Sequence, residues 1–160
     1  MLEIEDKTTK GFIKLVEGAL KPVFSIIPAE DLRGINKILL LDECEDEEFK
    51  LTGGFYCAAH DNQTSTYIEL YPPKIIDAKP FFVPKTNFSK KYSIVKMFLH
   101  ELGHHKCGIK NMKTREIEAD KYMLLYLKKL YGKWIYLFDF MARIDSVLKT
   151  LRADKGRSPK

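Results

Sequence analysis

Residues 100–105 of the 160-residue chain read HELGHH, and they hold three of its four histidines. Four residues make slightly more than one turn of a helix, so His100 and His104 are expected on one face, roughly 6 Å apart along the axis. Two imidazoles placed in this way can converge on one metal ion. The alternative is a pair of hydrogen-bonded histidines in a helix that packs in the core.

The surroundings of the two histidines favour a catalytic zinc site. Zinc accepts neutral imidazole nitrogen, and catalytic sites combine three protein ligands with a water molecule. Glu101 follows the first histidine and can take a proton from that water as a general base. The preceding turns are apolar at Ile94, Val95, Phe98 and Leu99. The helix is therefore expected to be buried. Unpaired polar groups in a buried helix are costly, so the two histidines are expected to have binding partners there.

A second segment, residues 114–123 (TREIEADKYM), adds two carboxylates with helical spacing. Glu116 and Asp120 lie four residues apart, on a face that apolar residues continue. Glu116 is a candidate third ligand, and Asp120 is a candidate acceptor for the far nitrogen of a ligand histidine. Glu118 is expected to point roughly 160° away from Glu116. The alternative is that both glutamates only favour a helix N-terminus.

The two segments together resemble the gluzincin metallopeptidases, in which a His-Glu-x-x-His helix is followed by a helix bearing Glu-x-x-Ala-Asp. HELGH and EIEAD match both parts in that order, and IPAEDLRGINKILLLDE adds a weaker likeness to minigluzincins and ImmA/IrrE-type peptidases. The strong part of the resemblance covers residues 98–122. The resemblance implies that His100, His104 and Glu116 bind zinc. It also implies that Glu101 is the general base and that Asp120 is an outer carboxylate that supports a ligand.

Two further roles are needed for a peptidase. Residues 66–71 (TYIELY) are the last expected strand before the motif helix, and we predict that this strand lines the cleft and pairs with an extended substrate. Its candidate substrate-facing residues are Tyr67, Glu69 and Tyr71.

Thermolysin-like relatives stabilise the oxyanion with a downstream histidine, but no histidine follows His105 in this chain. The candidates for that role are His60, Tyr122, Tyr126, Tyr131 and Tyr136.

Hydrophobic periodicity and turn residues predict one α+β domain over residues 1–160. A small antiparallel sheet is expected to pack on the zinc-binding HExxH helix and the Glu-bearing helix, with helices flanking them at both ends of the chain. The expected ranges are 8–20 for the N-terminal helix, 37–71 for the sheet, 89–131 for the zinc-site helices, 133–151 for the C-terminal helix and 152–160 for a basic tail.

The expected helix ends follow from capping and breaking residues. Thr8 or Thr9 is the expected cap of the first helix, and Pro22 is its expected stop. The motif helix is expected to begin at an Asn87 or Ser89 cap and to end at Gly108. The next helix is expected to run from about Thr114 to Tyr131.

Composition limits the class of protein. The chain is 45% hydrophobic and 31% charged, which is typical of a globular domain. It shows no secretory-type start and no apolar run long enough for a bilayer, and its three cysteines have no paired spacing. We therefore predict a cytoplasmic protein with reduced thiols and no membrane partner. The net charge of +5 at pH 7 could favour binding to nucleic acid, but no basic run is interleaved with stacking aromatic residues. Nucleic acid is therefore not the expected partner.

The sequence thus predicts a zinc metalloendopeptidase with one zinc ion per chain. It would hydrolyse polypeptides with a water molecule that Glu101 activates on the zinc ion. The alternative is a zinc-stabilised regulatory or binding module, of phage or mobile-element type, without peptide turnover. An intact Glu101 favours the enzyme, because a structural metal site does not need it.

Overall fold

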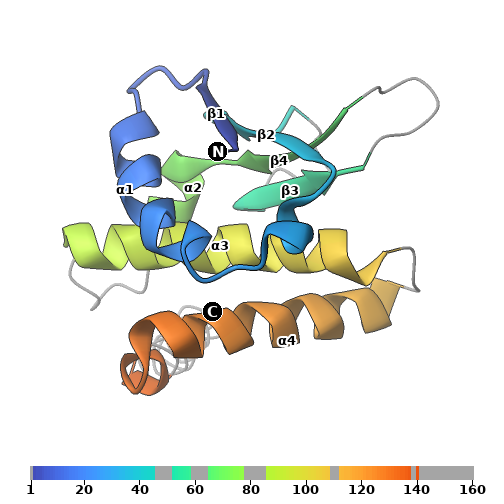
Figure 1. Ribbon diagram of the computed structural model, residues 1–160. Coiled ribbons are helices and arrows are strands. Elements are labelled where there is room, and N and C mark those ends of the chain that lie inside the picture. Colours follow the sequence, from blue (N-terminus) through green and yellow to red (C-terminus); the bar gives the residue numbers. More distant parts are fainter. Residues whose placement is uncertain are drawn as a thin grey trace, which may run out of the picture.

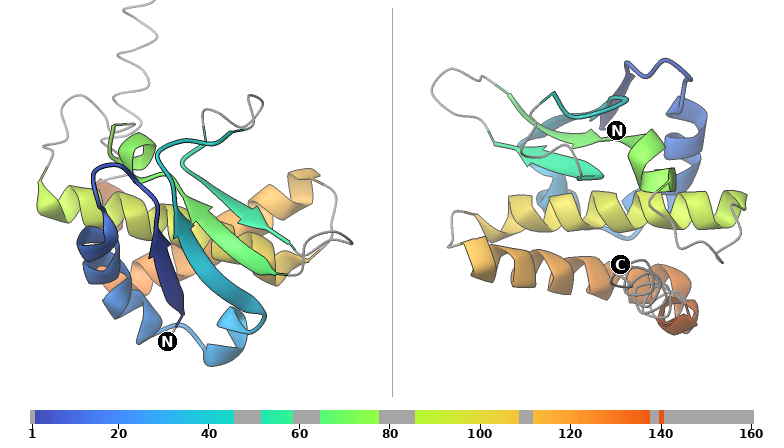
Figure 2. Two further views of the ribbon diagram at one scale, coloured as in Figure 1. Left: turned by 90° about the horizontal axis from the view of Figure 1, so that it is seen from above. Right: turned by 180° about the vertical axis from the view of Figure 1, so that it is seen from behind.

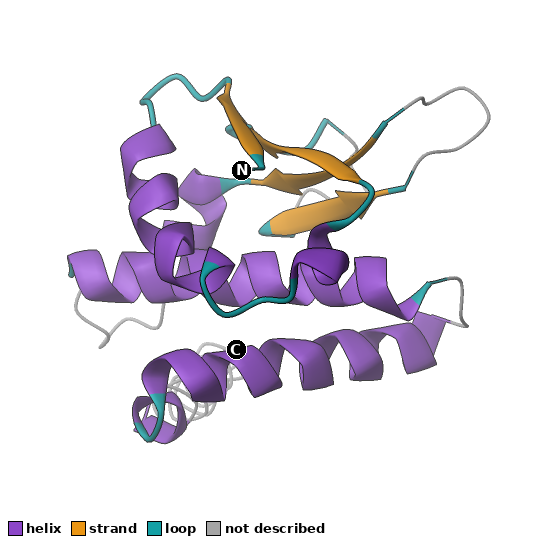
Figure 3. Ribbon diagram, in the orientation of Figure 1, coloured by secondary structure: helices purple, strands orange, loops and turns teal. Residues whose placement is uncertain are grey.

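The computed structural model describes residues 2–45, 52–58, 65–77, 86–108, 112–137 and 140. In chain order its elements are β1 (Glu3–Asp6), α1 (Ile13–Phe24), the 3-10 helix η1 (Ala29–Leu32), β2 (Ile35–Leu40), β3 (Gly54–Cys57), β4 (Thr66–Leu70), α2 (Pro72–Asp77), α3 (Asn87–Cys107) and α4 (Met112–Tyr131) (Figure 1). Helices and strands occur together, as Figure 3 shows, so the mixed α and β content that the sequence predicts is confirmed.

The four strands form one sheet in the order β1-β2-β4-β3. β1 and β4 both pair in parallel with β2, whereas β3 pairs antiparallel with β4. The predicted antiparallel sheet over residues 37–71 is therefore wrong: the sheet is mixed, and it includes β1, which the sequence pattern does not predict. The chain crosses over through α1 before it enters β2, and such a crossover makes successive strands parallel.

The long helix α3 lies between the sheet and α4, and Figure 2 shows this layering from behind. Its apolar face is fully buried, with Ile94, Val95, Phe98 and Leu99 all at 0% exposure. The burial that the sequence predicts for this helix is confirmed. Each such side chain contributes about 1.5–3 kcal/mol when it leaves water, so α3 is held firmly at the centre of the domain.

The first helix begins and ends later than the sequence predicts. α1 starts at Ile13 rather than near residue 8, and neither Thr8 nor Thr9 is its cap. Asp6 instead accepts hydrogen bonds from the backbone N–H groups of Phe12 and Ile13, at 2.6 and 2.8 Å. Pro22 lies inside the last turn and does not stop the helix. A proline there removes one backbone hydrogen bond at a point where the helix is already ending.

The boundaries of α3 and α4 lie close to their predicted positions. Thr86 caps α3, because its side chain accepts a hydrogen bond from the Ser89 backbone N–H at 3.1 Å. The predicted caps, Asn87 and Ser89, are therefore one and three residues too late. Gly108 ends the helix as predicted, and its φ of +63° lies in the left-handed region that glycine adopts easily. α4 begins at Met112, two residues before the predicted Thr114, and ends at Tyr131.

The chain continues past α4 in helical form at residues 134–137 and 140. The rest of the predicted C-terminal helix (133–151) and the basic tail (152–160) lie outside the described residues. Cys44, Cys57 and Cys107 are all described, and none of them forms a disulfide. Among the described helices, none has the length and apolar character that a bilayer crossing requires.

Candidate functional site

The C-terminal half of α3 carries the residues of the HELGHH stretch. His100 and His104 lie one turn apart, with their Nε2 atoms 3.1 Å from each other. The side chain of His104 is 9% exposed and that of His100 is 21% exposed. The predicted convergence of the two imidazoles is confirmed.

α4 brings Glu116 to the same point. Its two carboxylate oxygens lie 3.4 Å from His100 Nε2 and 3.4 Å from His104 Nε2. These three residues, called the metal triad below, place their ligand atoms within 4.8 Å of one another. They are close enough to hold a metal ion, as the sequence predicts.

A glycine allows α3 and α4 to approach so closely. A Cβ atom at Gly103 would lie 2.7 Å from Ala119 Cα and 2.8 Å from the Ala119 carbonyl oxygen. Both distances are shorter than real carbon contacts, so only a residue without a side chain fits here. Gly103 lies one position before His104, and Ala119 lies one position before Asp120. The contact therefore fixes the two helices at the level of the metal triad.

Asp120 occupies the outer position that the sequence assigns to it. Its carboxylate accepts a hydrogen bond from His100 Nδ1 at 3.0 Å. A neutral ring that donates from Nδ1 presents the lone pair of its other nitrogen, and His100 Nε2 faces His104 and Glu116. Outer carboxylates of this kind are a regular feature of metal-bound histidines.

His104 favours the neutral form. Burial and the neighbouring His100 lower the pKa of His104 below the ordinary histidine value. Its Nδ1 atom is buried and has no hydrogen-bond partner. The metal triad therefore combines an imidazole that favours the neutral form, a second imidazole that is oriented by Asp120, and a carboxylate.

Glu101 lies on the side of α3 that faces the sheet. It is 5% exposed, and burial together with the Glu116 carboxylate raises its pKa to about 8. The backbone N–H of Tyr56 on β3 donates a hydrogen bond to this carboxylate. A buried carboxyl group with a raised pKa beside a cluster of ligand atoms is typical of catalytic acid–base groups.

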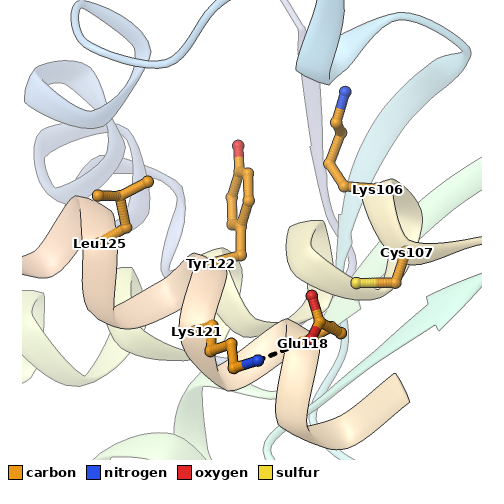
Figure 4. Close-up of a pocket in the computed structure, with 6 residues that line it drawn as sticks. All are labelled: Lys106, Cys107, Glu118, Lys121, Tyr122 and Leu125. Carbon is orange, nitrogen blue, oxygen red and sulfur yellow. Dashed lines mark hydrogen bonds and ion pairs between the residues drawn. The ribbon is translucent and has the colours of Figure 1, made fainter. Parts of the chain in front are cut away.

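Glu118 points away from the metal triad, as predicted. Its carboxylate pairs with Lys121 at 2.9 Å, and both line a pocket of about 320 Å³ on a different face of α4 (Figure 4). The lining residues of that pocket are Lys106, Cys107, Glu118, Lys121, Tyr122 and Leu125. Cys107, which the sequence places three residues after His104, belongs to this pocket and not to the triad.

The predicted substrate strand is wrong. Tyr67, Glu69 and Tyr71 lie on or next to β4, which pairs with β2 on one side and β3 on the other. Neither edge of β4 is open to a peptide. Tyr71 is also fully buried, and its hydroxyl bonds to Glu69. Among the described strands, β3 is the one at this edge of the sheet, and its Tyr56 amide points at Glu101.

Most candidates for an oxyanion-stabilising group are occupied elsewhere. Tyr122 and Tyr126 donate to Asp31, at 2.7 and 3.4 Å. Tyr131 packs edge-on against Tyr92 and Phe88. Tyr136 is 62% exposed and lies five residues beyond the end of α4, and His60 lies outside the described residues.

Two residues near Glu101 are missed by the sequence prediction. Tyr56 comes from β3, and no sequence signal connects it to the motif helix. Its hydroxyl donates to His105 Nδ1 at 2.9 Å, while His105 Nε2 donates to the Arg33 carbonyl at 3.0 Å.

The second missed residue is Arg115, which precedes Glu116 and lies four residues before Ala119. That spacing is a sequence signal that could have placed Arg115 on the face of α4 that meets α3.

Comparison of the chain with protein-family models, curated proteins and solved structures gives no match. The function is therefore inferred from the chemistry of the site itself.

Proposed function

We propose that the chain is a zinc-dependent metallopeptidase that hydrolyses peptide bonds. The observation that carries this proposal is the spacing of the metal triad. Tetrahedral ligands at zinc–nitrogen distances of about 2.0–2.1 Å are about 3.3 Å from one another. The three contacts here are 3.1, 3.4 and 3.4 Å. Two imidazoles and one carboxylate also form a donor set that suits zinc and leaves a fourth position for water or substrate.

The convergence of three ligand atoms on one point supports a cation. When His100 is neutral and donates to Asp120, its Nε2 atom and the Glu116 oxygens are both acceptors. Acceptors that face each other without a proton between them repel. A divalent cation would turn these repulsions into ligand bonds.

Glu101 has the position and burial of a general base. When bound, zinc would polarise the scissile carbonyl and make a water molecule easier to deprotonate. Glu101 would accept the proton of the attacking water and later donate it to the leaving amine. Burial and Glu116 raise the pKa of Glu101 to about 8, and a nearby divalent cation would oppose that shift and favour the carboxylate form.

The open edge of β3 is consistent with an extended substrate. β3 is paired on one side only among the described strands, and Tyr56 on it contacts Glu101. A peptide that adds to an exposed strand gains main-chain hydrogen bonds, and side-chain pockets then set its preference. We place the substrate beside β3, within reach of the metal triad.

The proposal is tested by digestion of a peptide library with zinc-loaded protein, followed by mass spectrometry of the products. Wild type is expected to cleave, and Glu101→Gln is expected to lose at least about 100-fold in rate, at the low end of a general base's contribution, while it keeps its zinc. Glu118→Gln is the matched control, because this glutamate pairs with Lys121 on another face of α4. It should cleave like wild type.

A zinc-loaded wild type that leaves the library intact would refute the peptidase. If zinc still raises its melting temperature, the alternative of a zinc-stabilised regulatory module replaces the enzyme. If neither zinc binding nor cleavage is detected, the metal proposal fails as a whole.

A further inference from the structure

The metal triad and Glu101 leave one part of the proposed reaction without a protein group. When water attacks a carbonyl carbon, a C–O bond forms and the carbonyl π electrons move to the oxygen, which becomes negatively charged. Donors placed at that oxygen are a large source of rate enhancement in acyl transfer. The tyrosines of α4 do not supply such a donor, because Tyr122 and Tyr126 donate to Asp31 and Tyr131 is packed against other rings.

Arg115 lies on the face of α4 that meets α3. It is one turn before Ala119, which contacts Gly103, so its side chain leaves α4 at the helix–helix contact. Its Nε atom is buried and has no hydrogen-bond partner. An arginine N–H that is removed from water without an acceptor is costly, so a substrate oxygen that accepted a hydrogen bond from Nε would offset this cost.

The charge of Arg115 reaches the proposed catalytic groups. It acts electrostatically on Glu101, on His104 and on Tyr56, which belong to α3 and β3. Arg115 is therefore a cation within electrostatic range of the general base, one metal ligand and the edge strand. Its guanidinium is planar, always charged and suited to carboxylate and other anionic oxygens.

We propose that Arg115 is a catalytic residue of this site, whose Nε–H donates a hydrogen bond to the scissile carbonyl oxygen as that oxygen becomes negative. The inference rests on the proposed peptidase. The water proton goes to Glu101 in the attack, and when the C–N bond breaks, the oxygen regains its double bond and Glu101 protonates the amine. No further reactant is required.

The first test measures binding of a tetrahedral oxyanion and needs no turnover. Inorganic phosphate is titrated into zinc-loaded protein by calorimetry, with zinc content determined for each sample. Arg115→Gln is expected to bind phosphate about 10- to 100-fold more weakly than wild type with unchanged zinc, and Arg115→Lys should fall between them. Lys113→Gln is the control, because it removes the same charge two residues away from an exposed position.

The second test uses a peptide that wild type cleaves. Arg115→Gln is expected to lower kcat by about 10²- to 10³-fold, as loss of one oxyanion donor does elsewhere, with little change in KM. Unchanged phosphate affinity in Arg115→Gln would overturn the inference and leave the peptidase intact. Loss of zinc in both Arg115 variants would overturn it too, because Arg115 would then support the metal site.

A third outcome separates the oxyanion from another anionic oxygen. If Arg115→Gln raises KM only for peptides with a free C-terminal carboxylate and not for their C-terminal amides, Arg115 binds a substrate carboxylate and the oxyanion role is wrong. If wild type cleaves no peptide but binds phosphate through Arg115, the peptidase fails while the anion site stands.

Discussion

α3 and α4 carry two polar clusters that differ in how their hydrogen-bonding groups are satisfied. In the Asp31 cluster (Asp31, Lys106, Tyr122 and Tyr126), one carboxylate accepts from an ammonium group and two hydroxyls, at 2.7, 2.7 and 3.4 Å. In the metal triad, His104 Nε2 lies 3.1 Å from His100 Nε2 and 3.4 Å from a Glu116 oxygen, and His104 Nδ1 has no partner. A cluster with matched donors and acceptors stabilises the fold, whereas the metal triad offers three ligand atoms to the proposed cation.

The two clusters also lie on different faces of α4. Tyr122 follows Asp120 by two residues, and two residues turn a helix by roughly 200°. The same helix pair therefore has one face that ties it to η1 and another that is available for a ligand. Substitutions in the metal triad should therefore change metal binding, whereas substitutions in the Asp31 cluster should change the free energy of unfolding.

The largest difference is expected in metal content. His104→Ala removes one ligand atom and should leave almost no zinc after gel filtration, whereas Tyr122→Phe in the Asp31 cluster should keep one zinc per chain. Zinc at 100 times its dissociation constant stabilises a protein by about 2.7 kcal/mol. That gain should appear as a higher melting temperature in wild type and be absent in His104→Ala. Equal zinc content in the two proteins would place the ion elsewhere.

A smaller but more selective effect is expected at the two glutamates of α4. Glu116→Gln should weaken zinc binding by at least about 100-fold, because an amide is a poorer ligand than a carboxylate and a neutral group attracts a cation less. Glu118→Gln should bind zinc like wild type, since its partner is Lys121. Zinc titration in competition with a chelator measures both. The reverse order would contradict the helix register described above.

Stability rather than metal binding should respond in the Asp31 cluster. Asp31 is 6% exposed, and Asp31→Asn keeps its shape but removes the charge that pairs with Lys106. Lys106 can regain water, so the expected loss is about 2 kcal/mol in the free energy of unfolding. Urea denaturation measures it, with the exposed neighbour Glu30→Gln as control. A loss of zinc stoichiometry in Asp31→Asn would show that the two clusters are not separate.

The smallest effect concerns acid pH. Burial alone would raise the pKa of Asp31, but hydrogen bonds from Lys106 and Tyr122 outweigh it and hold the pKa below its usual value. A carboxyl group with a lowered folded-state pKa contributes its full stability above the unfolded value of about 3.9 and loses it as pH falls through the folded value. The stability difference between wild type and Asp31→Asn should therefore be constant near neutral pH and shrink below about pH 4. A difference that increases on acidification would contradict this sign.

The metal triad could be predicted because its geometry is local. His100 and His104 share a helix face by their spacing alone, and so do Glu116 and Asp120. Only one further fact was needed, the packing of two consecutive helices on each other, and a short connection favours that arrangement. The positions of Glu118 and of the helix end at Gly108 follow from the same local rules.

The sheet could not be predicted in the same way, because its order depends on contacts between distant residues. β4 has the alternation of a strand with one buried face, but alternation does not tell whether a strand lies at an edge or between two neighbours. β1 is four residues long and mostly charged, so its pattern gives no sign of pairing. Tyr56 reaches Glu101 only because β3 ends up at the edge beside α3.

The close contact at Gly103 bears on which ion the site would select. Two ligands come from α3 and one from α4, so the separation of the helices also sets the separation of the ligand atoms. Gly103→Ala would force the helices apart and lengthen the ligand distances without altering a ligand. Zinc prefers short bonds, whereas larger cations such as Ca²⁺ form longer ones of about 2.3–2.6 Å, so this variant should lose zinc affinity relative to larger divalent ions. In the proposed zinc site, ion selectivity would then depend on a residue that offers no ligand atom.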